Sequence, residues 1–273
     1  PAPYWLSYPE MIKLSDGVPK YLVTTKENGY KVTAEQVEKM ITSKTKMFVF
    51  SSPSNPCGAV YSQRELKELA NVFAKNPQIF VVADEIYEHI NYVGAHQSIA
   101  QFEEIKDQVI IVNGVSKAYA MTGWRLGYAC GPKEVIAQMT KIHQYCIMSA
   151  PSMAQFALIE AAMNGDDEVK KMRDEYNHRR RVILKGLKDA GLECFEPYGA
   201  FYAFPCIKST GLSSEEFCEK FLMSKSVAIV PGNAFGACGE GYVRISYAAS
   251  MENIKTAMER LAEFTDEIKK GKI

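Results

Sequence analysis

The sequence predicts an α/β protein in which a mainly parallel sheet forms a large domain and a smaller α+β domain follows it. Short runs rich in Val, Ile and Phe alternate with amphipathic stretches over the first half of the chain, at 46–52, 79–84 and 109–113. Such continuous apolar runs, separated by helical patterns, are typical of buried parallel strands. Beyond Gly191, short strand patterns and two helical patterns follow one another, which indicates a separate α+β unit.

The helices are predicted from capping signals and from apolar periodicity. Ser62 and Glu65 form a capping box ahead of apolar residues that fall on one helical face. Further helical patterns occupy 133–145, 151–163 and 167–190. We therefore expect a large domain over residues 1–170 and a small domain over 171–273, joined by the long helix near 167–190.

The small domain is predicted from shorter patterns of both kinds. Strands are expected at 200–205, 226–230 and 242–248. One helix is predicted to begin at a second capping box, formed by Ser213 and Glu216, and another to span about residues 251–265.

Charge and composition argue against several classes of partner. Lys plus Arg and Asp plus Glu both number 32, so the formal net charge is zero and nothing favours nucleic acid or an anionic membrane. The one basic cluster, Arg179–Arg181, lies inside a helical pattern and is interpreted as a solvated face. No apolar run approaches the roughly 18 residues that a membrane-spanning helix needs.

The cysteines indicate the cellular compartment of the protein, and the first residues indicate whether the sequence is a fragment. Seven cysteines are scattered without a CxxC pair, which favours reduced thiols and a cytoplasmic protein. No secretory signal pattern is visible. The chain opens with PAPYWLSYPE and lacks an initial Met, so we expect it to be a fragment of a longer protein.

Common nucleotide, metalloprotease and esterase motifs do not occur in the sequence. The run GACGEG at 236–241 fits neither nucleotide-binding spacing and is interpreted as a turn. The four histidines show no metal-ligand spacing, and no metal site is predicted.

Two polar features follow predicted strands of the large domain, at the edge where open α/β sheets bind ligands. Asn55, in SSPSNPCG, is either a turn former or a rigid hydrogen-bond donor. Asp84, in VVADEIY, is either a helix N-cap or a buried carboxylate that requires a cation, with Tyr87 three residues further on.

Two further features each contain a basic residue among apolar ones. Lys117 and Arg125, in GVSKAYAMTGWRLGY, are the only charges in a run of small and aromatic residues. Lys117 is either an exposed helix residue or a desolvated, nucleophilic amine, and the planar fork of Arg125 suits a phosphate. Arg244, in YVRISYA, is either a solvent-facing residue of an edge strand or a carboxylate clamp.

An amine, an arginine, a carboxylate and amide or hydroxyl donors are what an aldehyde cofactor with a phosphate and a pyridine ring requires. The chain closely resembles class I pyridoxal-phosphate aminotransferases, of the bacterial and archaeal aspartate/aromatic branch, over essentially its whole length. The motifs that carry the resemblance are SPSNPCGAVYS, DEIYEHI, NGVSKAYAMTGWRLGYACGPKEVI, GAFYAFP, VPGNAFG and GYVRISYAAS. The resemblance implies the fold-type-I transferase architecture, pyridoxal 5′-phosphate as cofactor, and transfer of an amino group between an amino acid and a 2-oxo acid such as 2-oxoglutarate.

The resemblance also implies the roles of individual residues. Lys117 forms a Schiff base with the cofactor and then moves the substrate α-proton. Asp84 pairs with the pyridinium nitrogen, while Tyr87 and Asn55 donate hydrogen bonds to the phenolate oxygen.

The remaining roles concern the phosphate and the substrate. Ser116 and Arg125 hold the phosphate, Arg244 binds the substrate α-carboxylate, and Asn55 also contacts the substrate. Trp5 stacks on the cofactor ring and contacts substrate, although an aromatic residue near a chain start could equally belong to the core. Many relatives carry a phosphate-binding Ser where this chain has Gly114. Relatives also have a substantial N-terminal segment ahead of the point where this chain begins, so the N-terminal part of the large domain is expected to be missing.

Three further expectations come from the same resemblance. The protein is expected to be a homodimer whose active sites share residues from both subunits. A β-lyase that uses the same cofactor and fold is an alternative, and so is an aminotransferase-like sensor domain of a transcriptional regulator. The amino acid that the protein prefers stays open.

Overall fold

The computed structural model describes residues 1–272 and divides into two compact units. The first unit consists of Pro1–Lys31, Ser54–Ala59 and the chain from Asp174 onward, and the second consists of Val32–Pro53 and Val60–Arg173. The last boundary lies close to the predicted one at residue 170, but the first 31 residues group with the C-terminal part. The division into functional domains at 1–170 and 171–273 stays a prediction.

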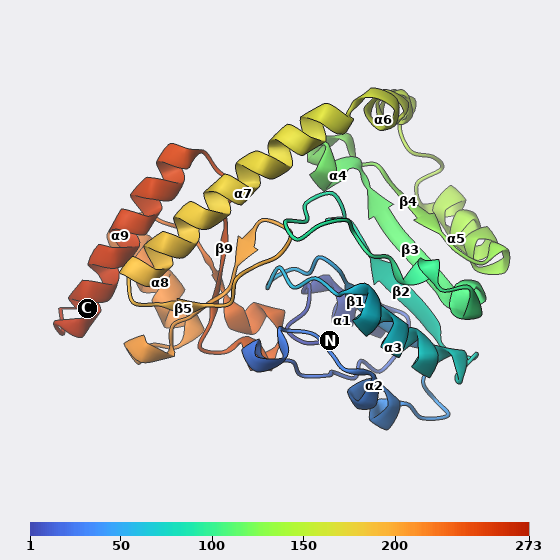
Figure 1. Cartoon of the computed structure of the whole chain (residues 1–273), viewed down its shortest axis with the longest axis horizontal. Helices are drawn as coiled ribbons and strands as arrows, with labels where there is room; N and C mark the ends of the chain where they lie inside the picture. Colours follow the sequence, from blue (N-terminus) through green and yellow to red (C-terminus); the bar gives the residue numbers. More distant parts are fainter. Residues whose placement is uncertain (273) are drawn as a thin grey trace. The chain divides into compact units, whose positions relative to one another are not determined.

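The second unit is built around a four-stranded sheet of order β1-β2-β3-β4 (Figure 1). Its strands are β1 Met47–Ser51, β2 Phe80–Asp84, β3 Val109–Gly114 and β4 Gly127–Cys130. The first three are parallel and β4 runs antiparallel to β3. The mainly parallel sheet and its first three strands are therefore confirmed, while β4 was not predicted because a short Gly-containing strand leaves little periodic signal.

Helix α3, Gln63–Ala74, covers one face of this sheet (Figure 1). The predicted capping box is present, since the Ser62 side chain accepts a hydrogen bond from Glu65 N and the Glu65 carboxylate accepts one from Ser62 N. The ring of Phe73 packs on that of Phe48 in β1, with centroids 5.2 Å apart. Phe48 and Phe73 are both buried, so burial of apolar surface fixes α3 against the sheet.

Other helices of the second unit connect the strands or follow the sheet. They are α2 Ala34–Met40, η2 Ile99–Gln101, η3 Glu103–Gln108, α4 Val115–Ala118, η4 Thr122–Trp124, α5 Lys133–Cys146 and α6 Ser152–Asn164. Helix α7, Asp166–Asp189, then carries the chain from the second unit into the first. The three helices predicted between 133 and 190 are thus present.

The first unit contains two small sheets, β5-β7 and β6-β9-β8. Their strands are β5 Glu193–Cys194, β6 Tyr202–Ala203, β7 Pro205–Cys206, β8 Val230–Pro231 and β9 Val243–Ser246. Its helices are α1 Ser7–Leu14, η1 Lys26–Asn28, η5 Lys208–Thr210, α8 Ser214–Lys225, η6 Gly232–Phe235, η7 Ala237–Gly239 and α9 Met251–Lys269. The α+β character predicted for the C-terminal part is confirmed.

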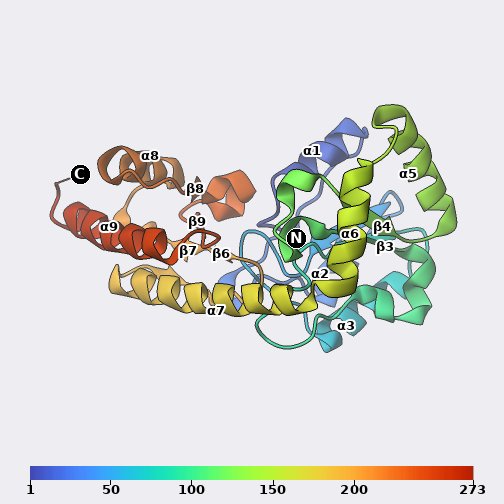
Figure 2. The same ribbon diagram turned by 90° about the horizontal axis from the view of Figure 1, so that it is seen from above.

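Helices α7 and α9 lie side by side in the first unit (Figure 2). The buried hydroxyl of Thr265 in α9 donates to the carbonyl oxygen of Ala190, which follows α7, at 3.0 Å. The interpretation of Arg179–Arg181 as a solvated face is wrong for Arg180, whose side chain is only 11% exposed. It donates to Glu196 at 2.7 Å and to the carbonyl oxygen of Pro197 at 3.0 Å.

Two predicted strands are shorter than the sequence patterns. The pattern at 200–205 divides between β6 and β7, which belong to different sheets. The pattern at 226–230 is a strand only at its end, because Ser226 is left-handed (φ 54°) at the C-cap of α8. Within residues 1–272, no helix combines the length and apolar character needed to cross a membrane.

Candidate active site

The carboxyl ends of β2 and β3 bring two predicted site segments to one edge of the sheet. Asp84 is the last residue of β2 and is in register with Val112 of β3. The next amide, Glu85 N, donates to Val112 O at 2.9 Å. Strand β3 ends at Gly114 and runs directly into α4, which carries Lys117. Because the two strands are parallel, Asp84 and the segment that carries Lys117 lie at the same edge of the sheet.

Asp84 begins a turn and no α-helix follows it. Its Oδ1 accepts a hydrogen bond from Ile86 N at 3.2 Å, and residues 86–89 form a turn. The helix N-cap interpretation is therefore wrong, because the side chain caps a turn instead. This turn carries Tyr87, which is 4% exposed, so a buried tyrosine lies three residues after the half-buried carboxylate.

Helix α4 is a single turn fixed by its apolar residues. Val115 and Ala118 are buried, whereas Ser116 and Lys117 between them are half-buried. Val115 packs in a small cluster with Leu126 and Ala154. The apolar surroundings expected for Lys117 are thus present only on the side of Val115 and Ala118. Lys117 itself is half-buried.

Arg125 directly follows the 3-10 helix η4 in a left-handed conformation, with φ 56°. Its side chain is exposed and donates from Nη1 to Thr122 O at 2.8 Å. This contact occupies one of the five N–H donors of a guanidinium. The donors that remain suit an anionic group with several oxygens.

Gly114 ends β3 where two strands approach closely. It is in register with Gly127 of β4. A Cβ at position 114 would lie 2.8 Å from Gly127 Cα and 2.9 Å from Leu126 O. The absence of the phosphate-binding Ser at this position is therefore matched by a backbone that leaves no room for a side chain.

Asn55 and Arg244 are brought into contact within the first unit. Arg244 Nη1 donates to Asn55 Oδ1 at 3.0 Å. Arg244 lies in β9, the middle strand of its sheet, and is half-buried. The interpretation as an exposed edge-strand residue is thus wrong. Asn55 is both a turn residue and a buried hydrogen-bonding group.

The loop that carries Asn55 is tightly packed. Ser54 N donates to Ala59 O at 2.9 Å, and Gly58 N donates to Ser54 O at 2.9 Å. Gly58 is left-handed, with φ 68°, and a Cβ there would lie 2.4 Å from Pro197 Cβ. Only glycine combines that backbone conformation with that approach.

Two aromatic residues beside Arg244 were not predicted as part of the site. The Arg244 Cζ atom lies 4.5 Å from the ring centroid of Tyr202 and 4.8 Å from that of Phe235. Both residues occur in motifs that carry the family resemblance, GAFYAFP and VPGNAFG. Their relation to Arg244 depends on long-range pairing, which leaves no local signal.

Trp5 belongs to the first unit and precedes α1. It is 37% exposed and packs edge-on against Tyr8, with ring centroids 5.3 Å apart. The structure therefore does not place Trp5 in the core, while cofactor stacking stays a prediction.

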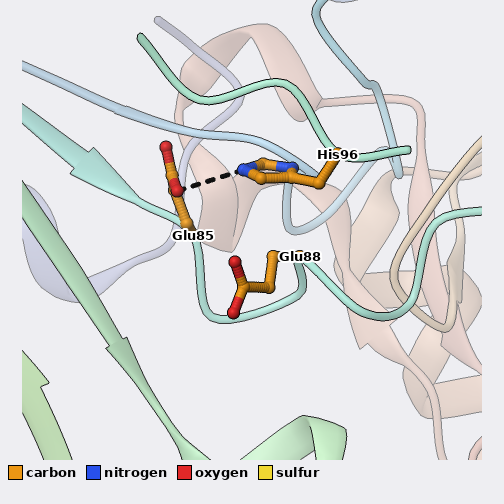
Figure 3. A group of neighbouring side chains, drawn as sticks. All are labelled: Glu85, Glu88 and His96. Atoms are coloured by element: carbon orange, nitrogen blue, oxygen red, sulfur yellow. Dashed lines mark ion pairs between the residues drawn. The ribbon is translucent and has the colours of Figure 1, made fainter. Parts of the chain in front are cut away.

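Glu85, next to Asp84, forms an ion pair with His96 (Figure 3). His96 Nε2 lies 3.1 Å from Glu85 Oε2, although the direction of approach is not that of a hydrogen bond. One ligand atom of each of Glu85, Glu88 and His96 lies within 4.8 Å of the others. Glu85 is buried, and the imidazole of His96 is the basic group that lies beside its carboxylate. The expectation of no metal site stays a prediction.

A cavity of about 400 Å³ lies behind α4, among apolar side chains of α6. Gly114 and Val115 contribute to its wall, together with the ion-paired side chains of Glu88 and His89. Lys117, Asp84 and Arg125 are not among the residues that line it. This cavity is therefore not the place where the predicted site residues meet.

Comparison with known proteins relates almost the whole chain to a single family. The family model for aminotransferase class I and II matches residues 1–261. An aspartate aminotransferase of Bacillus sp. (strain YM-2) is 44% identical over 97% of this chain and 69% of its own length.

Solved structures agree with the family model. An aromatic aminotransferase from Pyrococcus horikoshii OT3 superposes with a TM-score of 0.95 at 40% identity, covering 98% of this chain and 73% of that one. An aspartate aminotransferase from Thermus thermophilus, solved with maleate, gives a TM-score of 0.91 at 41% identity over 96% of this chain and 68% of that one. The α/β fold predicted from the sequence is confirmed.

Proposed function

The chain belongs to the aminotransferase class I and II family, and from this premise we propose that it is a pyridoxal-5′-phosphate-dependent transaminase. Its substrates are an L-amino acid of the aspartate or aromatic kind and a 2-oxo acid such as 2-oxoglutarate. The proposed substrates are supported by relatives that bear the names of aspartate and aromatic-amino-acid aminotransferases, at 44% and 39% identity.

The donor set of the chain fits this cofactor. Asp84 is the last residue of one parallel strand and Lys117 follows the end of its neighbour, and this single observation supports the proposal most strongly. An amine suits the aldehyde, a carboxylate suits the pyridine nitrogen, and the exposed guanidinium of Arg125 suits the phosphate. When bound, pyridoxal phosphate supplies an electron sink for the charge that develops on the substrate α-carbon.

The residues of the chain then have separate tasks. The Asp84 carboxylate keeps a proton on the ring nitrogen by charge pairing. The amine of Lys117 would hold the cofactor aldehyde and, when displaced by the substrate amine, would move the proton of the substrate α-carbon to the cofactor carbon that carried the aldehyde. Tyr87 and Asn55 donate hydrogen bonds to the phenolic oxygen.

Anchoring falls to other side chains. Ser116 and Arg125 hold the phosphate, Arg244 binds the α-carboxylate of the substrate, and Trp5 stacks on the ring. We propose in addition that the protein is a cytoplasmic homodimer whose sites use groups from both subunits.

The test is an amino-acid panel on the purified protein with pyridoxal phosphate, followed by the visible absorbance of the cofactor. We expect aspartate or aromatic amino acids to convert the spectrum and 2-oxoglutarate to restore it. Lys117→Ala should abolish turnover, whereas Lys133→Ala, an exposed lysine at the start of α5, should not. Turnover by Lys117→Ala at the parental rate would contradict the assignment. Release of ammonia and an oxo acid without any acceptor would instead support the β-lyase alternative.

A further inference from the structure

The backbone of Arg244 is fixed in position by the pairing of its strand with two neighbours. It lies in β9, between β6 and β8, and is in register with Val230 of β8. Tyr202 belongs to the neighbouring strand β6 and is in register with Ser246. The backbone pairing of β6 with β9 therefore fixes the position of the Tyr202 ring relative to Arg244.

The guanidinium group of Arg244 lies over two buried aromatic rings. Its Cζ is 4.5 Å from the ring centroid of Tyr202, which is 7% exposed, and 4.8 Å from that of Phe235, which is fully buried. Such separations are those of cation–π contacts, which are strongest away from water. A cation–π contact uses the face of the guanidinium, whereas its N–H donors point outward in its plane.

The second ring is fixed by the same apolar cluster as the Asn55 loop. Phe235 packs with Tyr30, Cys57, Ala59 and Phe204, and its ring meets that of Phe204 edge-on at 6.1 Å. Cys57 and Ala59 follow Asn55 in the loop whose amide oxygen accepts the hydrogen bond from Arg244. One cluster thus locates both a ring and an acceptor that contact the guanidinium.

We propose that Tyr202 and Phe235 are positioning residues that hold the Arg244 guanidinium in the orientation that receives a substrate carboxylate. The inference rests on the proposed role of Arg244 in binding that carboxylate. An arginine side chain has many rotamers, and ordering it during binding lowers affinity. The two rings order it beforehand, so their loss weakens binding of any carboxylate at this position without changing the reacting groups.

The variants Tyr202→Leu and Phe235→Leu remove the rings. We expect each to raise the KM for both the amino acid and the 2-oxo acid about tenfold, as loss of one desolvated cation–π contact predicts. The kcat and the spectrum of the bound cofactor should change little. The Kd of maleate, an unreactive dicarboxylate, measured by calorimetry, should rise by a similar factor.

Two variants control for the hydroxyl and for the loss of apolar volume. Tyr202→Phe keeps the ring and should bind maleate within about twofold of the parent. Phe221→Leu truncates an equally buried ring in α8, which packs on Phe217 and Phe264, and should leave the Kd of maleate unchanged.

Two results would overturn the proposal: parental maleate affinity in Tyr202→Leu, or an equal loss in Tyr202→Phe. Tyr202→Leu decides the question if Phe235→Leu does not fold. A parent protein that binds maleate but transfers no amino group contradicts the proposed function alone, since the maleate affinities still decide the role of the rings.

Discussion

The amide oxygen of Asn55 accepts a hydrogen bond from Nη1 of Arg244 at 3.0 Å, between residues 189 positions apart in the sequence. Because the oxygen faces a cation, the amide is oriented and its NH2 group points elsewhere as a donor. This contact couples a residue proposed to touch the cofactor to one proposed to bind the substrate.

Replacing Asn55 should separate these two functions. Asn55→Ala leaves Arg244 without this acceptor and should lower the free energy of unfolding by about 1.5–3 kcal/mol, the range for hydrogen bonds to charged groups. Asn55→Asp keeps an acceptor for Arg244 but loses the NH2 donor. We expect near-parental stability in urea for Asn55→Asp, with a shifted pH midpoint in the visible absorbance of the bound cofactor. Equal stability of the two variants would show that the hydrogen bond is not what holds the loop.

Gly58→Ala should destabilise the loop that carries Asn55. The new Cβ would meet Pro197 Cβ at 2.4 Å and Gly199 O at 2.7 Å, at a φ of 68°. Strain and overpacking together should lower the free energy of unfolding by about 2–4 kcal/mol. Gly211→Ala is the matched control, since its φ is 74° and nothing lies within 4 Å. Its cost in urea denaturation should be only about 1 kcal/mol.

Gly114→Ser tests whether the hydroxyl found in many relatives can be restored. The Cβ would lie 2.8 Å from Gly127 Cα, so β3 and β4 must separate. We expect a loss of about 1–3 kcal/mol in the free energy of unfolding and weaker binding of pyridoxal phosphate by fluorescence titration. Gly123→Ser, where nothing lies within 4 Å, should leave both unchanged. Tighter cofactor binding by Gly114→Ser would refute the steric explanation.

The pair of Glu88 and His89 should make stability depend on pH. His89 Nε2 lies 3.0 Å from Glu88 Oε1. The hydrogen bond that His89 donates to Glu88 raises the pKa of His89 above 6.5, against the effect of burial. Burial tends to raise the pKa of Glu88, but the hydrogen bond and charge of His89 lower it below 4.5 overall.

The two groups therefore contribute to the free energy of unfolding over different pH ranges. The contribution of His89 is fully present below its unfolded pKa and is lost as the pH rises through the folded value. The contribution of Glu88 is present above its unfolded pKa and is lost as the pH falls through the folded value. His89→Gln should therefore cost about 0.2–0.5 kcal/mol near pH 5.5 and almost nothing near pH 8.5, a small effect because the His89 side chain is 42% exposed. Urea unfolding at both pH values, with Glu88→Gln as the paired variant, measures it. A cost that is the same at both values would exclude the ion pair as its origin.

Local signals in the sequence predicted the parts of the fold that local interactions determine. The capping boxes at Ser62 and Ser213 are both present and begin the helices expected from them. The strands β1, β2 and β3 followed from their apolar runs. These features depend on residues a few positions apart, so a single sequence contains the necessary information.

Contacts between distant segments were outside that information. The first residues pair with the chain around Val23, and Tyr4 N donates to Phe235 O at 3.0 Å. Arg180 was misinterpreted because its partners, Glu196 and Pro197, lie beyond the helix that carries it. The Asn55 and Arg244 pair was expected at one site through family resemblance alone, and no periodicity could have indicated the rings of Tyr202 and Phe235 beside it.

The division of the chain also has a consequence for biosynthesis. The first unit combines Pro1–Lys31 and Ser54–Ala59 with the chain from Asp174 onward, so its two early segments leave the ribosome long before their partners exist. Residues up to Arg173 contain the whole second unit and can fold first. Asn55 acquires its hydrogen bond from Arg244 only after a further 189 residues have been translated. Translation thus supplies the sheet edge with Asp84 and Lys117 before it supplies Arg244.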